Sequence, residues 1–182
     1  MKTQTIKIAL TINGKKLTLG HSFLENIEYM YGIDIKENQE AFDILVYSDN
    51  PKIRKSIALL SNISKKSISI LLNDDDQNVV QAVLGNYDLA PRIQHVQLMK
   101  IIKANHIEHL KTIASNHIVL YKKCNLYKII KILAKHENPA VRFELVRYHS
   151  THIIPKKILK KLSKDIDIDV SKAAIIKLKR VA

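Results

Sequence analysis

The sequence predicts a mainly α-helical protein: a right-handed superhelix of about five stacked helical pairs, preceded by a short β-hairpin. Three observations predict it. A turn-like hexapeptide recurs, apolar residues with helical spacing precede each copy, and apolar residues near the N-terminus alternate as in a strand. We expect residues 1–37 to form the hairpin and a linking helix that cap the array, and residues 38–182 to form the array itself.

The clearest element is a hexapeptide of the form acid-Asn-Pro-x-aliphatic-Arg, at residues 49–54 and again 88 residues later at 137–142. Looser copies lie at 75–80 and 166–171, and a degenerate copy surrounds His109. The aliphatic position of successive copies recurs at spacings of 26, 30, 32 and 29 residues. A near-constant period of this length is typical of stacked repeats, in which each unit buries its apolar face against its neighbours.

An apolar stretch precedes each hexapeptide, and its apolar residues recur at i, i+3 and i+4, which is helical spacing. These stretches are residues 41–46, 68–72, 98–102, 129–134 and 158–162. Each unit is therefore predicted to be a helix A, a tight turn and a helix B.

The hexapeptide itself has the composition of a helix start. Asp or Asn caps free N–H groups, and Pro at the first helical position has no N–H to leave unpaired. Arg54 and Arg142 then fall early in helix B, where a positive charge opposes the helix dipole. Two explanations are open: a salt bridge to an acidic turn residue of the same or a neighbouring unit, or a ladder of arginines that faces a ligand.

On these turns, the chain resembles the HEAT-like α-helical repeats and, more closely, the variant leucine-rich repeats, over roughly residues 38 to 180. The resemblance implies a helical-repeat fold. The iron–sulfur cluster of the variant family needs several cysteines and this chain has only Cys124, so no cofactor is expected. HEAT-like folds include DNA-alkylation glycosylases, which rely on Trp and a catalytic acid in a cationic groove. The chain has no Trp, which disfavours that enzymatic alternative.

Residues 5–19 read as two strands around Asn13-Gly14, the preferred two-residue hairpin turn. The predicted register sets Ile12 opposite Lys15, Leu10 opposite Leu17 and Ile8 opposite Leu19. A lone hairpin is marginal in water, so its apolar face is expected to cover the first repeat or to pair with a second copy in a homodimer. A helix from about Ser22 to Tyr31 is expected to link the hairpin to the array.

The net charge of +13 is concentrated in one half of the chain. Residues 1–90 carry 10 Lys and Arg against 11 Asp and Glu, whereas residues 91–182 carry 20 against 6. This asymmetry predicts a polyanionic partner, either nucleic acid or an acidic protein surface, although biased composition also explains many lysines. One cysteine, no signal-like start and no membrane-length apolar run predict a cytoplasmic protein without a membrane partner.

The candidate binding residues form basic stripes on the last two predicted pairs. They are Lys128, Lys131, Lys135, Arg142, Arg147, Lys156, Lys157, Lys160, Lys161 and Lys164. A solvated helix face, a nucleic-acid surface and a site for an acidic protein all fit this pattern. Nearby rings are few (Tyr121, Tyr127, Phe143 and Tyr148), which disfavours a mode in which a single strand stacks on aromatic side chains.

Three further clusters have metal-ligating side chains. His106, His109, His117 and Cys124 lack a paired ligand spacing, and the acidic runs 74–76 and 165–169 fall where the repeat needs capping turns. No catalytic motif with a defined mechanism occurs. The sequence therefore predicts a non-enzymatic binding or scaffold module, and a subunit devoted to protein assembly is the main alternative.

Overall fold

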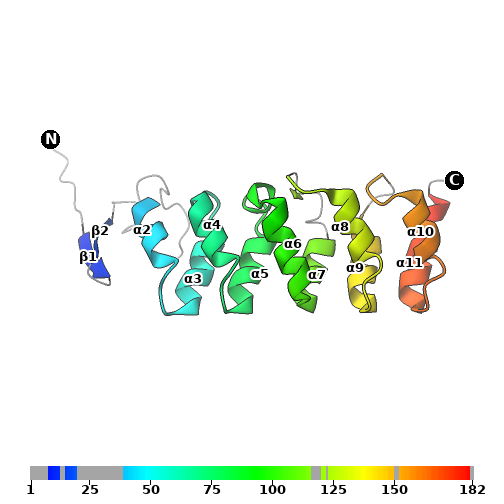
Figure 1. Ribbon diagram of the computed structural model, residues 1–182, viewed down its shortest axis with the longest axis horizontal. Coiled ribbons are helices and arrows are strands. Elements are labelled where there is room, and N and C mark those ends of the chain that lie inside the picture. Colours follow the sequence, from blue (N-terminus) through cyan, green and yellow to red (C-terminus); the bar gives the residue numbers. More distant parts are fainter. Residues whose placement is uncertain are drawn as a thin grey trace, which may run out of the picture. The chain divides into compact units, whose positions relative to one another are not determined.

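The computed structural model describes residues 8–12, 15–19, 39–115, 120–121, 123–149 and 152–180. This part of the chain is mainly helical, as the apolar spacing predicts. Its ten α-helices follow one another as five pairs, each an A helix and then a B helix (Figure 1). None of them is long and apolar enough to cross a membrane. The chain divides into two compact units, residues 1–86 and 87–182.

At the N-terminus, β1 (Ile8–Ile12) and β2 (Lys15–Leu19) pair antiparallel, with Leu10 opposite Leu17. The Asn13-Gly14 turn and the linking helix expected near Ser22 to Tyr31 lie outside the described residues. The capping role of the hairpin and the homodimer through it stay predictions.

The first unit contains two helical pairs, namely α2 (Gln39–Leu45), α3 (Pro51–Ala58), α4 (Lys65–Leu71) and α5 (Gln77–Gly85). The A helices are linked by Asp43 of α2, whose carboxylate accepts hydrogen bonds from the hydroxyls of Ser64 and Ser67 at the start of α4. Phe42 and Ile57 are completely buried in the core of this unit.

The second unit contains a short 3-10 helix and three helical pairs. They are η1 (Ala90–Arg92), α6 (His95–Ala104), α7 (Ile107–Ala114), α8 (Leu126–Leu133), α9 (Pro139–Tyr148), α10 (Lys156–Leu162) and α11 (Ile168–Lys179). Ile113, Leu145 and Ala174 are completely buried, one on each B helix at the same position of the repeat. Their apolar side chains form the common core of the unit.

Within each compact unit, the B helices approach one another more closely than the A helices do. In the second unit α9 packs along both α7 and α11, whereas α8 and α10 are further apart. Val141 of α9 and Val170 and Ala174 of α11 are small and buried, which suits close packing of the two helices. The wider spacing of the A helices leaves room for a groove between α8 and α10.

The turn before four of the five B helices caps the helix as predicted, whereas His106, directly before α7, makes no capping hydrogen bond with its side chain. Asn50 and Asn138 accept hydrogen bonds from the N–H groups of Lys52 and Ala140, at 3.0 and 2.9 Å, and a proline follows each cap. In the more acidic turns, Asp76 and Asp167 serve as caps. These two acidic runs are therefore turns that cap helices.

A second acceptor lies two residues before each of these caps, and the sequence did not reveal it. There the side chain accepts a hydrogen bond from the N–H of the capping residue. The four acceptors are Ser48, Asp74, His136 and Asp165. The acid written into the hexapeptide, Asp49 or Glu137, is one residue later and does not have this role.

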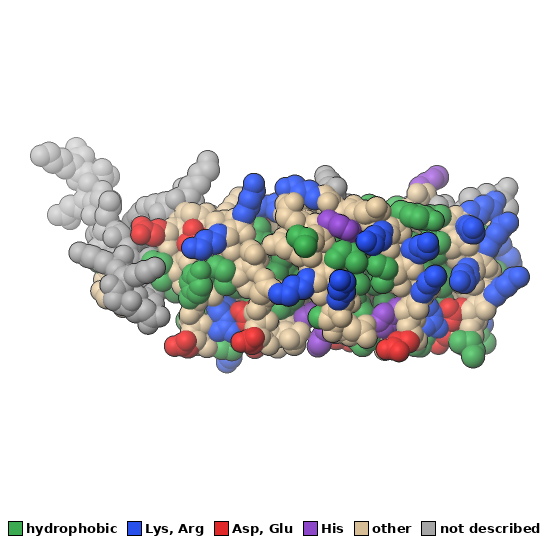
Figure 2. Space-filling model, viewed as in Figure 1, with side chains coloured by type: hydrophobic (Ala, Val, Ile, Leu, Met, Phe, Trp, Pro, Cys, Tyr) green, Lys and Arg blue, Asp and Glu red, His purple; other side chains and the backbone are tan. Residues whose placement is uncertain are grey.

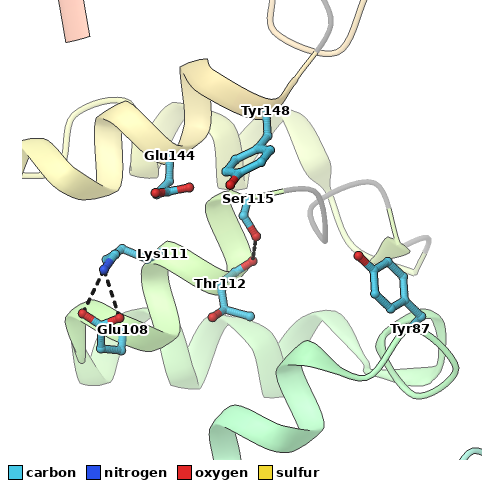
Figure 3. Close-up of a pocket in the computed structure, with 7 residues that line it drawn as sticks. All are labelled: Tyr87, Glu108, Lys111, Thr112, Ser115, Glu144 and Tyr148. Atoms are coloured by element: carbon cyan, nitrogen blue, oxygen red, sulfur yellow. Dashed lines mark hydrogen bonds and ion pairs between the residues drawn. The ribbon is translucent and has the colours of Figure 1, made fainter. Parts of the chain in front are cut away.

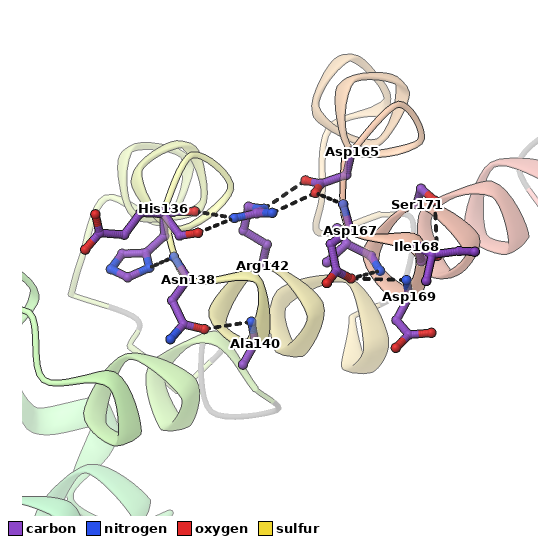
Figure 4. A network of polar contacts seen from close by, with 11 residues as sticks. His136, Asn138, Ala140, Arg142, Asp165, Asp167, Ile168, Asp169 and Ser171 are labelled. Carbon is purple, nitrogen blue, oxygen red and sulfur yellow. Dashed lines mark hydrogen bonds and ion pairs between the residues drawn. The ribbon is translucent and has the colours of Figure 1, made fainter.

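Arg54 and Arg142 use this second acceptor to fasten one pair to the next. Arg142 donates two hydrogen bonds to Asp165 of the following turn, at 2.8 and 2.7 Å, and two more to the backbone carbonyls of His136 and Glu137 (Figure 4). Arg54 makes the same contacts with Asp74, at 2.6 and 2.8 Å, and with the Ser48 carbonyl. The salt-bridge explanation is therefore confirmed, and in both cases the acid belongs to the turn of the next helical pair.

Candidate polyanion-binding groove

All eight predicted lysines are exposed in the second unit, on α8, on α10 or in the turns that follow them. Figure 2 shows Lys and Arg side chains gathered over α8 and α10. The structure therefore places the two predicted lysine stripes on α8 and α10, which are successive A helices of the second unit.

The two predicted arginines do not join this surface. Arg142 is 8% exposed, and its donors are committed to Asp165 and to backbone carbonyls, so its inclusion among residues that face a partner is corrected. Arg147 is exposed on α9 but does not line the groove. Its guanidinium carbon lies 4.9 Å from the centroid of the Tyr148 ring, and one of its guanidinium nitrogens lies 3.9 Å from a carboxylate oxygen of Glu144.

Between α8 and α10 lies a groove of about 230 Å³, and four of the predicted lysines line it. Lys131 and Lys135 belong to α8 and the turn after it, and Lys157 and Lys161 belong to α10. The remaining lining residues are Tyr127, Ala134, Ile158 and Leu162. The groove thus combines a cationic rim with an apolar floor.

Helix geometry explains why the lysines come in facing pairs. Lys157 and Lys161 are four residues apart on α10, which places them on one side of the helix, roughly 6 Å apart along the axis. Lys131 and Lys135 have the same spacing, with Lys135 in the turn that follows α8. The apolar stripe of α8, including Ile130 and Leu133, turns into the core. At the start of α8, Asn125 accepts a hydrogen bond from the Lys128 N–H at 3.0 Å and holds the first turn.

The positive charges in the groove are not neutralised locally. Among the described residues, no salt bridge joins Lys131, Lys135, Lys157 or Lys161 to a carboxylate, and no acidic side chain lines the groove. Lysines four residues apart repel each other, and Lys157 also lies in the first turn of α10, where a cation opposes the helix dipole. An anion in the groove would relieve all of these repulsions.

A second hollow, of about 290 Å³, lies beside α7 and α9 in the same unit (Figure 3). Its lining is Tyr87, Glu108, Lys111, Thr112, Ser115, Glu144 and Tyr148. Lys111 is paired with Glu108, at 3.0 Å from both carboxylate oxygens. Since its one lysine already has a carboxylate partner and Glu144 adds a second acid, this hollow lacks the excess of positive charge found in the groove.

The histidines and the cysteine form no recognisable metal site in the part of the chain that the structure describes, where no group of three or more His, Cys, Asp or Glu could hold an ion. The rings of His106 and His109 pack with centroids 4.3 Å apart, and His109 is buried. Burial raises the pKa of the Cys124 thiol, which disfavours the thiolate form needed for ligation. His117 lies outside the described residues.

Comparisons with protein-family models, curated proteins and solved structures found no match to this chain.

The apolar floor of the groove was not predicted. Tyr127 was noted only as one of a few nearby rings, and Ile158 only as part of the apolar stripe of its helix. Ile158 is half-buried, so one edge of the stripe remains open to the groove. The signal that could have located the floor is the i, i+3 spacing of Ile158 and Lys161, which sets an apolar and a charged residue on one side of α10.

Proposed function

We propose that the protein is a non-enzymatic helical-repeat module that binds a polyanion, either nucleic acid or an acidic protein surface, through the groove between α8 and α10. In this proposal the five pairs stack as a right-handed superhelix in the cytoplasm, and the N-terminal hairpin covers its first pair. The observation that carries the proposal is the set of four groove lysines without a carboxylate partner among the described residues.

A subunit for protein assembly is the second candidate, and it has an observation of its own. Ile168, Ile175 and Ile176 of the last helix are 62%, 41% and 54% exposed, and their spacing puts them on one side of α11. An exposed apolar helix face suits contact with another protein. In that case the groove lysines would contribute solubility rather than binding.

The test is a salt titration of binding to nucleic acid and to an acidic polypeptide. Replacing Lys131, Lys135, Lys157 and Lys161 together by Gln should lower affinity for the bound polyanion at least about tenfold and reduce the salt dependence by roughly one counterion per lysine. The matched control replaces Lys52, Lys55, Lys65 and Lys66, which are exposed in the first unit, by Gln and removes the same charge.

Retention of affinity in the control together with its loss in the groove variant supports the proposal. Equal losses in both variants would show a diffuse effect of net charge and would contradict a local site. Absence of any polyanion binding at low salt would remove the proposal and leave the assembly candidate, for which association through α11 should then be measured.

A further inference from the structure

The groove has two chemically distinct parts, and an occupant must suit both. The rim consists of four ammonium groups, which are hydrogen-bond donors only. The floor consists of the Tyr127 ring with Ala134, Ile158 and Leu162. Tyr127 is 57% exposed, so much of its surface is open to a ligand.

Duplex nucleic acid fits the rim but not the floor. Its phosphates could reach the lysines, but its bases are paired and stacked inside the helix, which leaves no apolar group to cover Tyr127 and Ile158. Duplex binding would therefore use the charge of the groove and leave its apolar floor in water.

An extended acidic peptide fits the floor better but conflicts with the donors of the rim. Its carboxylates could meet the lysines and an apolar side chain could reach the floor. Its backbone N–H groups need acceptors, however, and among the side chains that line the groove the Tyr127 hydroxyl is the one conventional acceptor. Peptide-binding grooves usually supply such partners, because an unpaired N–H in an interface costs affinity.

An unpaired nucleic-acid strand satisfies both parts. Its phosphate oxygens are acceptors without donors, and they complement a rim of donors without acceptors. An unpaired base presents a flat π-face, which stacks favourably on an exposed aromatic ring. With one ring in the groove, a single base would be held in this way, and the neighbouring phosphates would extend along the lysines.

Resting on the proposed polyanion-binding function, we infer that the groove between α8 and α10 binds single-stranded nucleic acid, with one base stacked on Tyr127 and the flanking phosphates on Lys131, Lys135, Lys157 and Lys161. Binding is independent of sequence. The four lysines are assigned to phosphates, and the amide, carboxylate and guanidinium side chains that make two-point contacts with base edges are not among the described residues that line the groove.

The experiment separates the stacked base from the phosphates. Binding is measured by fluorescence anisotropy to an oligothymidylate of about twelve nucleotides, to an abasic strand with the same number of phosphates, to a duplex of equal length and to a poly-glutamate peptide. Tyr127→Ala should weaken oligothymidylate binding about tenfold and leave abasic-strand binding unchanged, while Tyr127→Phe keeps the affinity because the ring remains. Tyr47→Ala is the matched control, since Tyr47 is 54% exposed in the first unit.

A second readout uses the absence of tryptophan from the chain. Tyr127→Trp introduces a single indole whose fluorescence should be quenched by oligothymidylate and not by the abasic strand. Equal loss of oligothymidylate and abasic-strand binding in Tyr127→Ala, or unchanged fluorescence on saturation with oligothymidylate, overturns stacking at this residue. Tighter binding of duplex or poly-glutamate overturns the choice of a single strand but leaves the polyanion function standing, whereas binding to none of the four removes both.

Discussion

Arg142 and Asp165 bury opposite charges together, with side chains 10% and 9% exposed. The hydrogen bonds from Arg142 lower the pKa of the Asp165 carboxyl, although partial burial opposes this shift. The ionised form of the Asp165 carboxyl is therefore favoured in the folded chain, and it stabilises the fold only while Arg142 is present to pair with it. At residue scale, the fold depends on such pairs more than on exposed charges.

Replacing Arg142 with Met should destabilise the protein by about 3 kcal/mol, because it leaves a buried carboxylate without its partner. Urea unfolding followed by circular dichroism measures the change. Arg147→Met is the control and should cost less than about 0.5 kcal/mol, since Arg147 is 55% exposed and lies 3.9 Å from Glu144. Equal stability of the two variants would contradict a structural role for the buried pair.

His149 should make stability dependent on pH. It is 2% exposed, its Nε2 lies 2.7 Å from the Ala114 carbonyl oxygen, and burial lowers its pKa. Because the folded pKa lies below the unfolded value of about 6.5, this contribution is full above that value and is lost as the pH falls from there through the folded pKa.

The urea concentration at the unfolding midpoint should therefore decrease as the pH is lowered from about 7.5 to about 5.5 in the unmodified protein. His149→Gln should flatten this dependence, because an amide can donate to Ala114 without titrating. His152→Gln, at an exposed position, should leave it unchanged. A dependence that survives in His149→Gln would assign it to another histidine.

At the scale of elements, the helices could be predicted because their apolar period repeats in every helical pair and four of the five B helices are capped by Asn or Asp. Two features without a period were missed. The segment around η1 buries Leu89 and Ile93, and Tyr121, noted beforehand only as a nearby ring, is fully buried. The groove was missed in part because its width depends on the distance between α8 and α10, and neither helix alone encodes that distance.

The cap of α8 supports the helix that carries half of the groove lysines. Asn125→Ala should cost about 1 kcal/mol in the free energy of unfolding, and Asn125→Ser should cost much less, because Ser can accept the same hydrogen bond from the Lys128 N–H. Thermal unfolding of the three proteins checks this order. If the Ser and Ala variants were equally unstable, the loss would not come from the cap.

At the scale of the whole molecule, charge and structure divide the chain near the same place. The charge asymmetry was visible in the sequence between residues 90 and 91, and the compact units divide between 86 and 87. The boundary predicted at residue 37 rested on the change from strand to helix periodicity, which is a local signal. The division into compact units depends instead on contacts between helices.

A fragment of residues 87–182 should fold alone and retain polyanion binding, because it contains the α7, α9 and α11 core and all four groove lysines. Circular dichroism should show a helical spectrum and a cooperative thermal transition, and anisotropy should give an affinity within about threefold of the full chain. The fragment of residues 1–86 should not bind. An unfolded 87–182 fragment would contradict its independence.

The ion pairs of Arg54 with Asp74 and of Arg142 with Asp165 restrict the order in which the helical pairs can follow one another. A pair that carries the arginine, the first or the fourth, must be followed by a pair whose turn has an acid two residues before its cap. Only the turns with Asp74 and Asp165 meet this condition among the four that the structure describes with such an acceptor, since Ser48 and His136 have no carboxylate. Shuffling or duplicating single pairs by recombination would therefore often leave the arginine without its carboxylate partner. The chain is lengthened most safely when an arginine-bearing pair and the pair with the matching Asp are copied together.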